Sequence, residues 1–201
     1  MTRPDAAKLG YAVALATLAT AAWWLVYRVE VDRLWALLAL GVLLLLPSRV
    51  QAAVLRKHFQ GRRAHLERKF DDALALYREQ LEALEQRPWK NRSVWLGWMF
   101  YTTRADAMVW NNIAALHLDR GEPERARSAA RRALELDPKY PLPWINLAGV
   151  SYQVDDRAEL ERCVAQAQRL GYRATTADQL IARAGAAWAK VQAGSELGKP
   201  S

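Results

Sequence analysis

Residues 107–140 read AMVWNNIAALHLDRGEPERARSAARRALELDPKY, and this stretch decides the fold that the sequence predicts. When it is shifted by 34 positions, identical or similar residue types coincide along the following part of the chain. The coinciding pairs are Trp110 with Trp144, Asn112 with Asn146, Ile113 with Leu147, Ala114 with Ala148, and Ala133 with Ala167. A constant internal period of this length predicts repeated supersecondary units that stack on one another.

The residue types in this stretch suit a pair of antiparallel helices. Two helices that cross closely need small side chains at their contact, and Ala114, Ala126 and Ala133 supply them. The turn between the helices needs a residue that tolerates a positive φ, as Gly121 does. Pro138 biases the residue before it away from the helical region, so we expect the second helix to end there.

This unit resembles the tetratricopeptide repeat (TPR), a family whose period is 34 residues. The matching positions are Trp110, Ile113, Ala114 and His117 on the first helix, Gly121 at the turn, Ala126, Ala130 and Ala133 on the second helix, and Pro138 at its end. The next unit keeps Trp144 and Ala167, whereas an earlier, weaker unit has Arg68 in place of the turn glycine. The resemblance implies an α-solenoid that binds segments of other proteins.

The resemblance also implies a groove lined by the first helix of each repeat. Its membrane-proximal end carries histidine and arginine, and the rest is small, apolar or amide-bearing. The predicted groove residues are His58, Arg62, His65, Met108, Asn111, Ala115, Leu118, Ile145 and Tyr152. We expect His58 and His65 to belong to a basic surface, and Asn111 to clamp a peptide backbone by both donating and accepting hydrogen bonds.

Two apolar runs precede the repeats. Residues 9–27 carry no charge and at about 1.5 Å per residue span roughly 28 Å, close to the thickness of a bilayer core. Residues 34–46 are shorter, which also suits a re-entrant helix. We expect two transmembrane helices, at about 9–29 and 33–47, in an anchor of residues 1–48. The alternative for the first run is a cleaved signal peptide, because residues 19–21 have the small-x-small form of a cleavage site.

A basic segment follows the second apolar run and predicts the topology. The positive-inside rule places it in the cytoplasm, so a hairpin places both termini there, in a multi-pass protein of a bacterial cytoplasmic membrane. The residues expected at the membrane interface, in contact with anionic headgroups, are Trp23, Trp24, Tyr27, Arg49, Arg56, Lys57, Trp95 and Trp98. The net charge of +8 would also suit nucleic acid, but its concentration beside an apolar run favours the membrane, and we expect no nucleic-acid partner.

The expected fold class is thus all-α: an N-terminal transmembrane hairpin, then a short TPR-like α-solenoid with a C-terminal capping helix. The solenoid domain covers residues 49–192, before a flexible tail at 193–201. Its parts are a weak repeat at 54–87, a Trp-rich insertion at 88–106, repeats at 107–140 and 141–174, and a capping helix at 175–192. The rings of the insertion, Trp95 and Trp98 among them, either fill a gap in the repeats or form an exposed aromatic patch.

The sequence contains no recognisable catalytic constellation, metal site or cofactor motif, so no enzyme activity, metal or cofactor is expected. The lone cysteine, Cys163, falls on a helical pattern and is expected to be a buried, inert thiol. The leading functional hypothesis is a membrane-anchored scaffold that binds another protein. The alternative is an accessory or assembly subunit of a larger membrane complex, whose hairpin packs against other helices.

Overall fold

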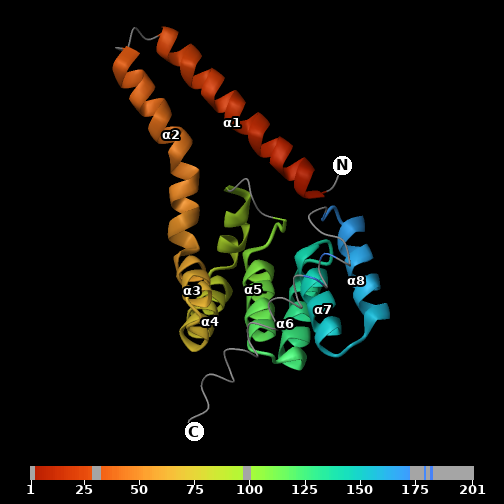
Figure 1. The fold of residues 1–201 in the computed structure, drawn as a ribbon. Helices are drawn as coiled ribbons and strands as arrows, with labels where there is room; N and C mark the ends of the chain where they lie inside the picture. The colour runs from red at the N-terminus through yellow and green to blue at the C-terminus, as the bar shows by residue number, and fades with distance from the viewer. Residues whose placement is uncertain (1–2, 29–32, 97–100, 173–178, 180–181, 183–201) are drawn as a thin grey trace. The chain divides into compact units, whose positions relative to one another are not determined.

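The computed structural model describes residues 3–28, 33–96, 101–172, 179 and 182. These residues form eight α-helices and one 3-10 helix, and they contain no strand, in agreement with the all-α expectation (Figure 1). The chain divides into two compact units, Met1–Val109 and Trp110–Ser201, so that the boundary falls within one helix. The predicted capping helix and tail lie largely or wholly outside the described residues.

The first unit begins with two long helices, α1 (Arg3–Arg28) and α2 (Arg33–Val54). Both correspond to the apolar runs, and α2 continues through Pro47 beyond the predicted end of the anchor. Within the described ranges, however, none of the helices has the combined length and apolar character needed to cross a bilayer. The run in α1 is rich in alanine and threonine, and that in α2 stops at Pro47, Ser48 and Arg49. The predicted transmembrane hairpin is therefore unsupported, and the predicted multi-pass membrane location is wrong.

The weak repeat of the first unit is a helical hairpin made of α3 (Arg56–Leu66) and α4 (Phe70–Gln86). Its core contains Leu55, Ala73, Tyr77 and Leu84, all almost fully buried. Gly61 provides the close approach between the helices, because a Cβ atom built on it would lie 2.8 Å from Cε1 of Tyr77. The two helices pack in this way because the glycine leaves room for the tyrosine ring.

The Trp-rich insertion begins with the 3-10 helix η1 (Pro88–Leu96), which contacts α1, α2 and α4. Val94 is buried, and Nε2 of Gln51 in α2 donates a hydrogen bond to the carbonyl oxygen of Ser93 at 3.0 Å. Trp89, by contrast, is 67% exposed, so this ring does not fill the gap between repeats. Trp98 and the side chain of Trp95 lie outside the described part of the chain, and both readings of these two rings stay predictions.

Four helices pack in the second unit: the C-terminal part of α5 (Ala105–Asp119), α6 (Pro123–Leu136), α7 (Leu142–Gln153) and α8 (Arg157–Arg169). The alanines that the repeat pattern placed at helix contacts are fully buried: Ala114, Ala126, Ala130, Ala133, Ala148 and Ala167. Helix α7 contacts both α6 and α8. A cluster of Ala148, Leu160, Cys163 and Val164 forms the core between α7 and α8. The small residues thus lie where the sequence predicted.

Four helices end in the same way. Gly121, which follows α5, has a φ of 71°. Its amide donates to the carbonyl oxygen of Leu118 at 2.9 Å, and the amide of Glu122 donates to the carbonyl oxygen of His117 at 2.8 Å. This pair of bonds is the Schellman motif, which satisfies carbonyls that the helix leaves free. The motif recurs with the positive-φ residues Arg68, Asp155 and Gly171. Arg68 therefore adopts the conformation of the glycine that it replaces in the repeat.

The positive φ at Gly121 gives a first prediction. Gly121→Ala should lower the free energy of unfolding by about 1 kcal/mol, because a Cβ in the left-handed region costs about 1–2 kcal/mol while alanine reduces the entropy of the unfolded chain. Urea unfolding followed by circular dichroism measures the change. Gly10→Ala in α1, where a Cβ would meet no atom within 4 Å, is the control and should not destabilise the protein. An unchanged midpoint for Gly121→Ala would contradict the account of the turn.

The contact between Gly61 and Tyr77 gives a second prediction. Gly61→Ala should destabilise the protein by about 1–3 kcal/mol, because the added methyl group overlaps the tyrosine ring in a packed core. If the ring is the cause, the same exchange in a Tyr77→Leu background should cost clearly less. Equal losses in both backgrounds, measured by the same urea unfolding, would show that the two residues do not interact.

Candidate functional site

The nine predicted groove residues are divided between the two units. His58, Arg62, His65 and Met108 belong to the first, and Asn111, Ala115, Leu118, Ile145 and Tyr152 belong to the second. Whether any of the nine binds a partner stays a prediction, but the structure shows which side chains reach the surface.

In the second unit, side chains join α5 and α7, the first helices of consecutive repeats. Nδ2 of Asn146 donates to both the carbonyl oxygen and Oδ1 of Asn111, at 2.9 Å each. Nε2 of Gln153 donates to the carbonyl oxygen of Leu118 at 3.0 Å. Both contacts span 35 positions, close to the repeat period, so the two helices are held in register along their length.

We call these hydrogen bonds between α5 and α7 the α5–α7 joint. Asn111 belongs to it, because this residue is only 6% exposed and its Oδ1 accepts from Asn146. The sequence predicted that Asn111 would be an open clamp for a peptide backbone. It did not predict the roles of Asn146 and Gln153 in joining the helices. The coincidence of Asn112 with Asn146 in the repeat alignment was a signal for Asn146, but it pointed to the neighbouring asparagine. Met108 is also buried.

Four of the predicted residues remain partly accessible: Ala115 and Leu118 on α5, and Ile145 and Tyr152 on α7. Ile145 and Tyr152 are four residues before and three residues after Gly149, and therefore share its side of α7. A Cβ on Gly149 would lie 3.1 Å from Cδ1 of Leu118, so this side of α7 meets α5 at that leucine. We call these four residues the α5/α7 surface; it carries no formal charge.

Tyr152 packs against the buried core of the second unit. It packs, with Trp144 and Leu147, against the core cluster of α7 and α8. That cluster includes Cys163, whose thiol lies 3.5 Å from Oε1 of Glu159. Burial, and then the charge of Glu159, raise the pKa of Cys163 to about 12. The raised pKa keeps the thiol protonated at neutral pH, and its burial agrees with the prediction from the sequence.

In the first unit, His58 differs from the basic surface residue that was expected. It is 2% exposed, and its ring centroid lies 5.4 Å from that of Phe59 and 5.9 Å from that of Tyr77. Its amide donates to Oε1 of Gln80 at 3.2 Å. Residues 58, 61 and 64 share one buried side of α3, and this three-residue spacing was the missed signal. Arg62 is exposed, and His65 is half-buried with its ring 5.8 Å from that of Phe70.

The residues predicted at a membrane interface also lie in the first unit. Trp23, Trp24, Tyr27, Arg49 and Arg56 are exposed. Lys57 is half-buried and forms an ion pair with Glu79 at 2.5 Å between Nζ and Oε2. Contact of these residues with lipid headgroups stays a prediction. Within the described residues, no group of three His, Cys, Asp or Glu side chains is arranged to hold a metal ion.

The burial of His58 gives a prediction about pH. Burial, and then the charge of Arg62, lower the pKa of His58 to about 4 from an ordinary value of 6.5. The unfolded chain therefore binds a proton more readily than the native protein between these values. Stability should be full above pH 6.5 and should fall as the pH decreases toward 4, by up to about 3 kcal/mol.

Urea unfolding at several pH values tests this prediction. His58→Gln should flatten the dependence between pH 6.5 and 4, whatever its effect on stability at neutral pH. The matched exchange His65→Gln, on the same helix, should leave the dependence in place. If His58→Gln has the same dependence as the unmodified protein, His58 is not the group responsible.

A comparison with protein families agrees with the packing of these helices. Residues 107–150 match the family model of the tetratricopeptide repeat. A comparison with curated proteins finds no significant match. The matched segment contains α6, most of α5 and most of α7, that is, one helix pair and the first helix of the next. Residues 107–150 therefore carry a tetratricopeptide repeat, and the resemblance inferred from the sequence is confirmed for this part of the chain.

Proposed function

We propose that this protein is a scaffold that binds a segment of another protein on the α5/α7 surface, and that its role is binding, not catalysis. The observation that carries the proposal is the joint between α5 and α7. It fixes the first helices of two consecutive repeats side by side, and stacked repeats present extended surfaces for partners in this way.

The chemistry of the surface defines the segment that it suits. Ala115, Leu118, Ile145 and Tyr152 offer small and apolar side chains with one phenolic hydroxyl. A tyrosine held rigid by a packed core contributes large contact area with little loss of side-chain entropy. Such a surface favours a partner helix or extended segment with apolar anchors, and affinity would come mainly from slow dissociation.

Site-specific photocrosslinking tests this assignment. A photoreactive phenylalanine analogue replaces Ala115, Ile145 or, as the control, Arg162 on the exposed side of α8. The proposal expects the same partner to be captured from positions 115 and 145 and not from 162. Capture from all three positions alike, or from none, would refute binding at this surface.

Variants of the surface give the quantitative prediction. Once a partner segment is captured, Tyr152→Ala should weaken its binding by about 10–100-fold, mostly through faster dissociation, because truncation of a buried aromatic anchor typically costs about 1.5–3 kcal/mol. Surface plasmon resonance measures the rates. Since Tyr152 also packs on the core, Ala115→Arg provides a second test that leaves the core untouched. Arg162→Ala should have no effect, and unchanged binding in both surface variants would contradict the proposal.

A further inference from the structure

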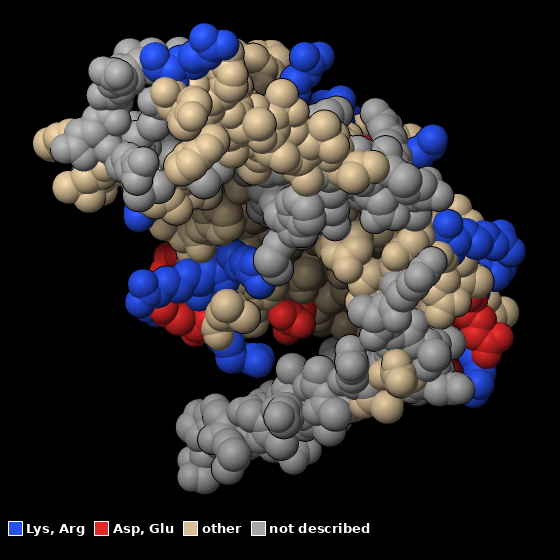
Figure 2. Space-filling model, turned by 90° about the horizontal axis from the view of Figure 1, so that it is seen from above, with Lys and Arg blue, Asp and Glu red and all other residues tan. Residues whose placement is uncertain are grey.

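A second apolar surface lies on α1 in the first unit. Leu9, Val13, Trp23, Trp24 and Tyr27 are between 55% and 82% exposed. Figure 2, viewed from the end where α1 and α2 lie in Figure 1, shows that the coloured residues there are largely uncharged, with lysine and arginine toward the edges. Exposed apolar surface of this extent marks a site of interaction.

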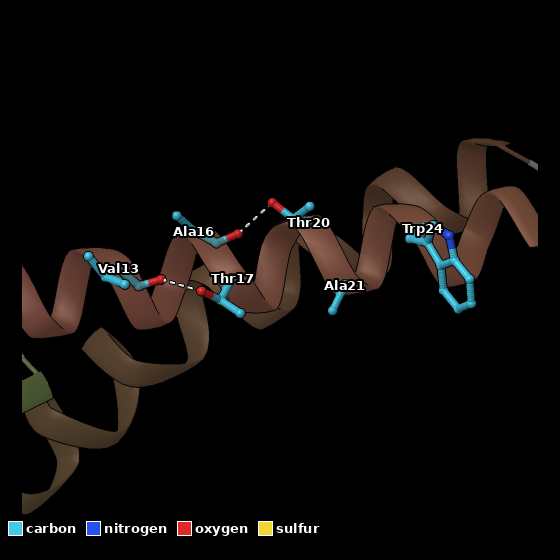
Figure 3. A pocket seen from close by; sticks show the side chains of 6 residues that line it. All are labelled: Val13, Ala16, Thr17, Thr20, Ala21 and Trp24. Carbon is cyan, nitrogen blue, oxygen red and sulfur yellow. Dashed lines mark hydrogen bonds between the residues drawn. The ribbon is translucent and has the colours of Figure 1, made fainter.

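Part of this surface is hollowed into a groove of about 640 Å³. Its lining residues follow one another at steps of three and one along α1, and therefore lie on one side of the helix. They are Val13, Ala16, Thr17, Thr20, Ala21 and Trp24 (Figure 3). The four central residues are small and the two at the ends are larger, so the floor is open to the close approach of another helix.

The two threonines do not make the groove polar. Oγ1 of Thr17 donates to the carbonyl oxygen of Val13, and Oγ1 of Thr20 to that of Ala16, at 2.8 Å each (Figure 3). Each hydroxyl hydrogen is therefore already bonded within α1 and need not be satisfied by an occupant. Covering the groove with an apolar helix face thus leaves no unsatisfied donor behind.

We propose that this groove is occupied by α1 of a second copy of the chain, running antiparallel. With the symmetry axis between residues 18 and 19, Thr17 of one copy lies opposite Thr20 of the other, and Ala16 opposite Ala21. The same alignment places Val13 opposite Trp24 at each end. The small side chains of one copy thus meet small side chains of the other, and the large ones meet large ones. The surface is therefore self-complementary, as a twofold interface requires.

Charge favours the antiparallel direction. The guanidinium of Arg28 lies 5.0 Å from the ring centroid of Trp24, at the end of the groove. A parallel pair would bring the two Arg28 side chains together, and like charges repel. The antiparallel pair places Arg28 opposite Leu9, so that at about 1.5 Å per residue the two arginines are separated by roughly 28 Å. Antiparallel helix dipoles add a smaller favourable contribution.

The area involved approaches that of a standard dimer interface. If each of the five large exposed side chains buries roughly a further 100 Å², they and the four small groove residues together supply about 600–700 Å² per copy. A standard stable interface takes about 800 Å² from each partner. Leu38 and Val42 of α2 are also exposed apolar side chains in the same unit.

Mass measurement of the full chain in aqueous buffer tests the dimer. Native mass spectrometry at micromolar concentration should give twice the chain mass of 22.7 kDa. Thr20→Lys, which places an unpaired charge in the groove, should raise the dissociation constant about 100-fold or more. The control is Leu18→Lys, an exposed position on another side of α1, which should change it much less. A monomer in every condition, or a dimer unaffected by Thr20→Lys, would refute the proposal.

Disulfide trapping tests the direction. A mixture of the Val13→Cys and Trp24→Cys variants should cross-link on oxidation as a heterodimer, whereas either variant alone should not. Cys163 is buried and does not interfere. A mixture of Val13→Cys and Leu18→Cys is the matched control and should not cross-link. Trapping of Trp24→Cys with itself and not with Val13→Cys would overturn the antiparallel arrangement.

Discussion

The helix pairs of this protein depend on residues whose side chains are small or missing at the point of crossing. Gly61 admits the ring of Tyr77 between α3 and α4, and Gly149 admits Leu118 between α7 and α5. Buried alanines have the same role in α5, α6 and α8. The distance between two packed helices is set by the side chains at their contact. Only at this close spacing can Asn146 and Gln153 reach across to α5, so the hydrogen-bonded joint beneath the proposed binding surface follows from the small residues.

The same residues explain how much of the fold could be predicted. The period of 34 and the small residues at the helix contacts identified the helix pairs and the turn at Gly121, because these requirements act within one repeat. Arg68 shows the limit of such a pattern. It made the first repeat look degenerate, yet the backbone ends α3 with the hydrogen bonds seen after α5. The Schellman motif is defined by backbone bonds, so a non-glycine residue weakens the sequence signal without changing the structure.

Features that depend on distant residues could not be predicted. Leu55, at the start of α3, provides no side-chain cap, and Gln80 of α4 accepts from the amide of His58 and donates to the carbonyl of Val54. The partners are 22 and 26 positions away, beyond any local capping pattern. His58 was placed on the surface because its neighbours are basic, but it shares the buried side of α3. The apolar runs were read as membrane spans from their length, their lack of charge and the aromatic and basic residues near them, but within the described residues no helix is long and apolar enough to cross a bilayer.

Paired charged side chains and the two proposed binding surfaces lie on different parts of the chain, which affects where a ligand can bind. On the outer sides of α6 and α8, ion pairs form within a single helix, as between Arg132 and Glu135 and between Arg157 and Glu161. Exposed pairs of this kind contribute little to stability, but they leave each charge with a partner already in place. A ligand that docks there would have to compete with them. The described residues that line the groove on α1 and the α5/α7 surface carry no charge, so a ligand that covers them has no such pair to separate. Despite the net charge of +8, burial of apolar surface would therefore be expected to supply most of the affinity at both proposed interfaces, while charge would act mainly on orientation.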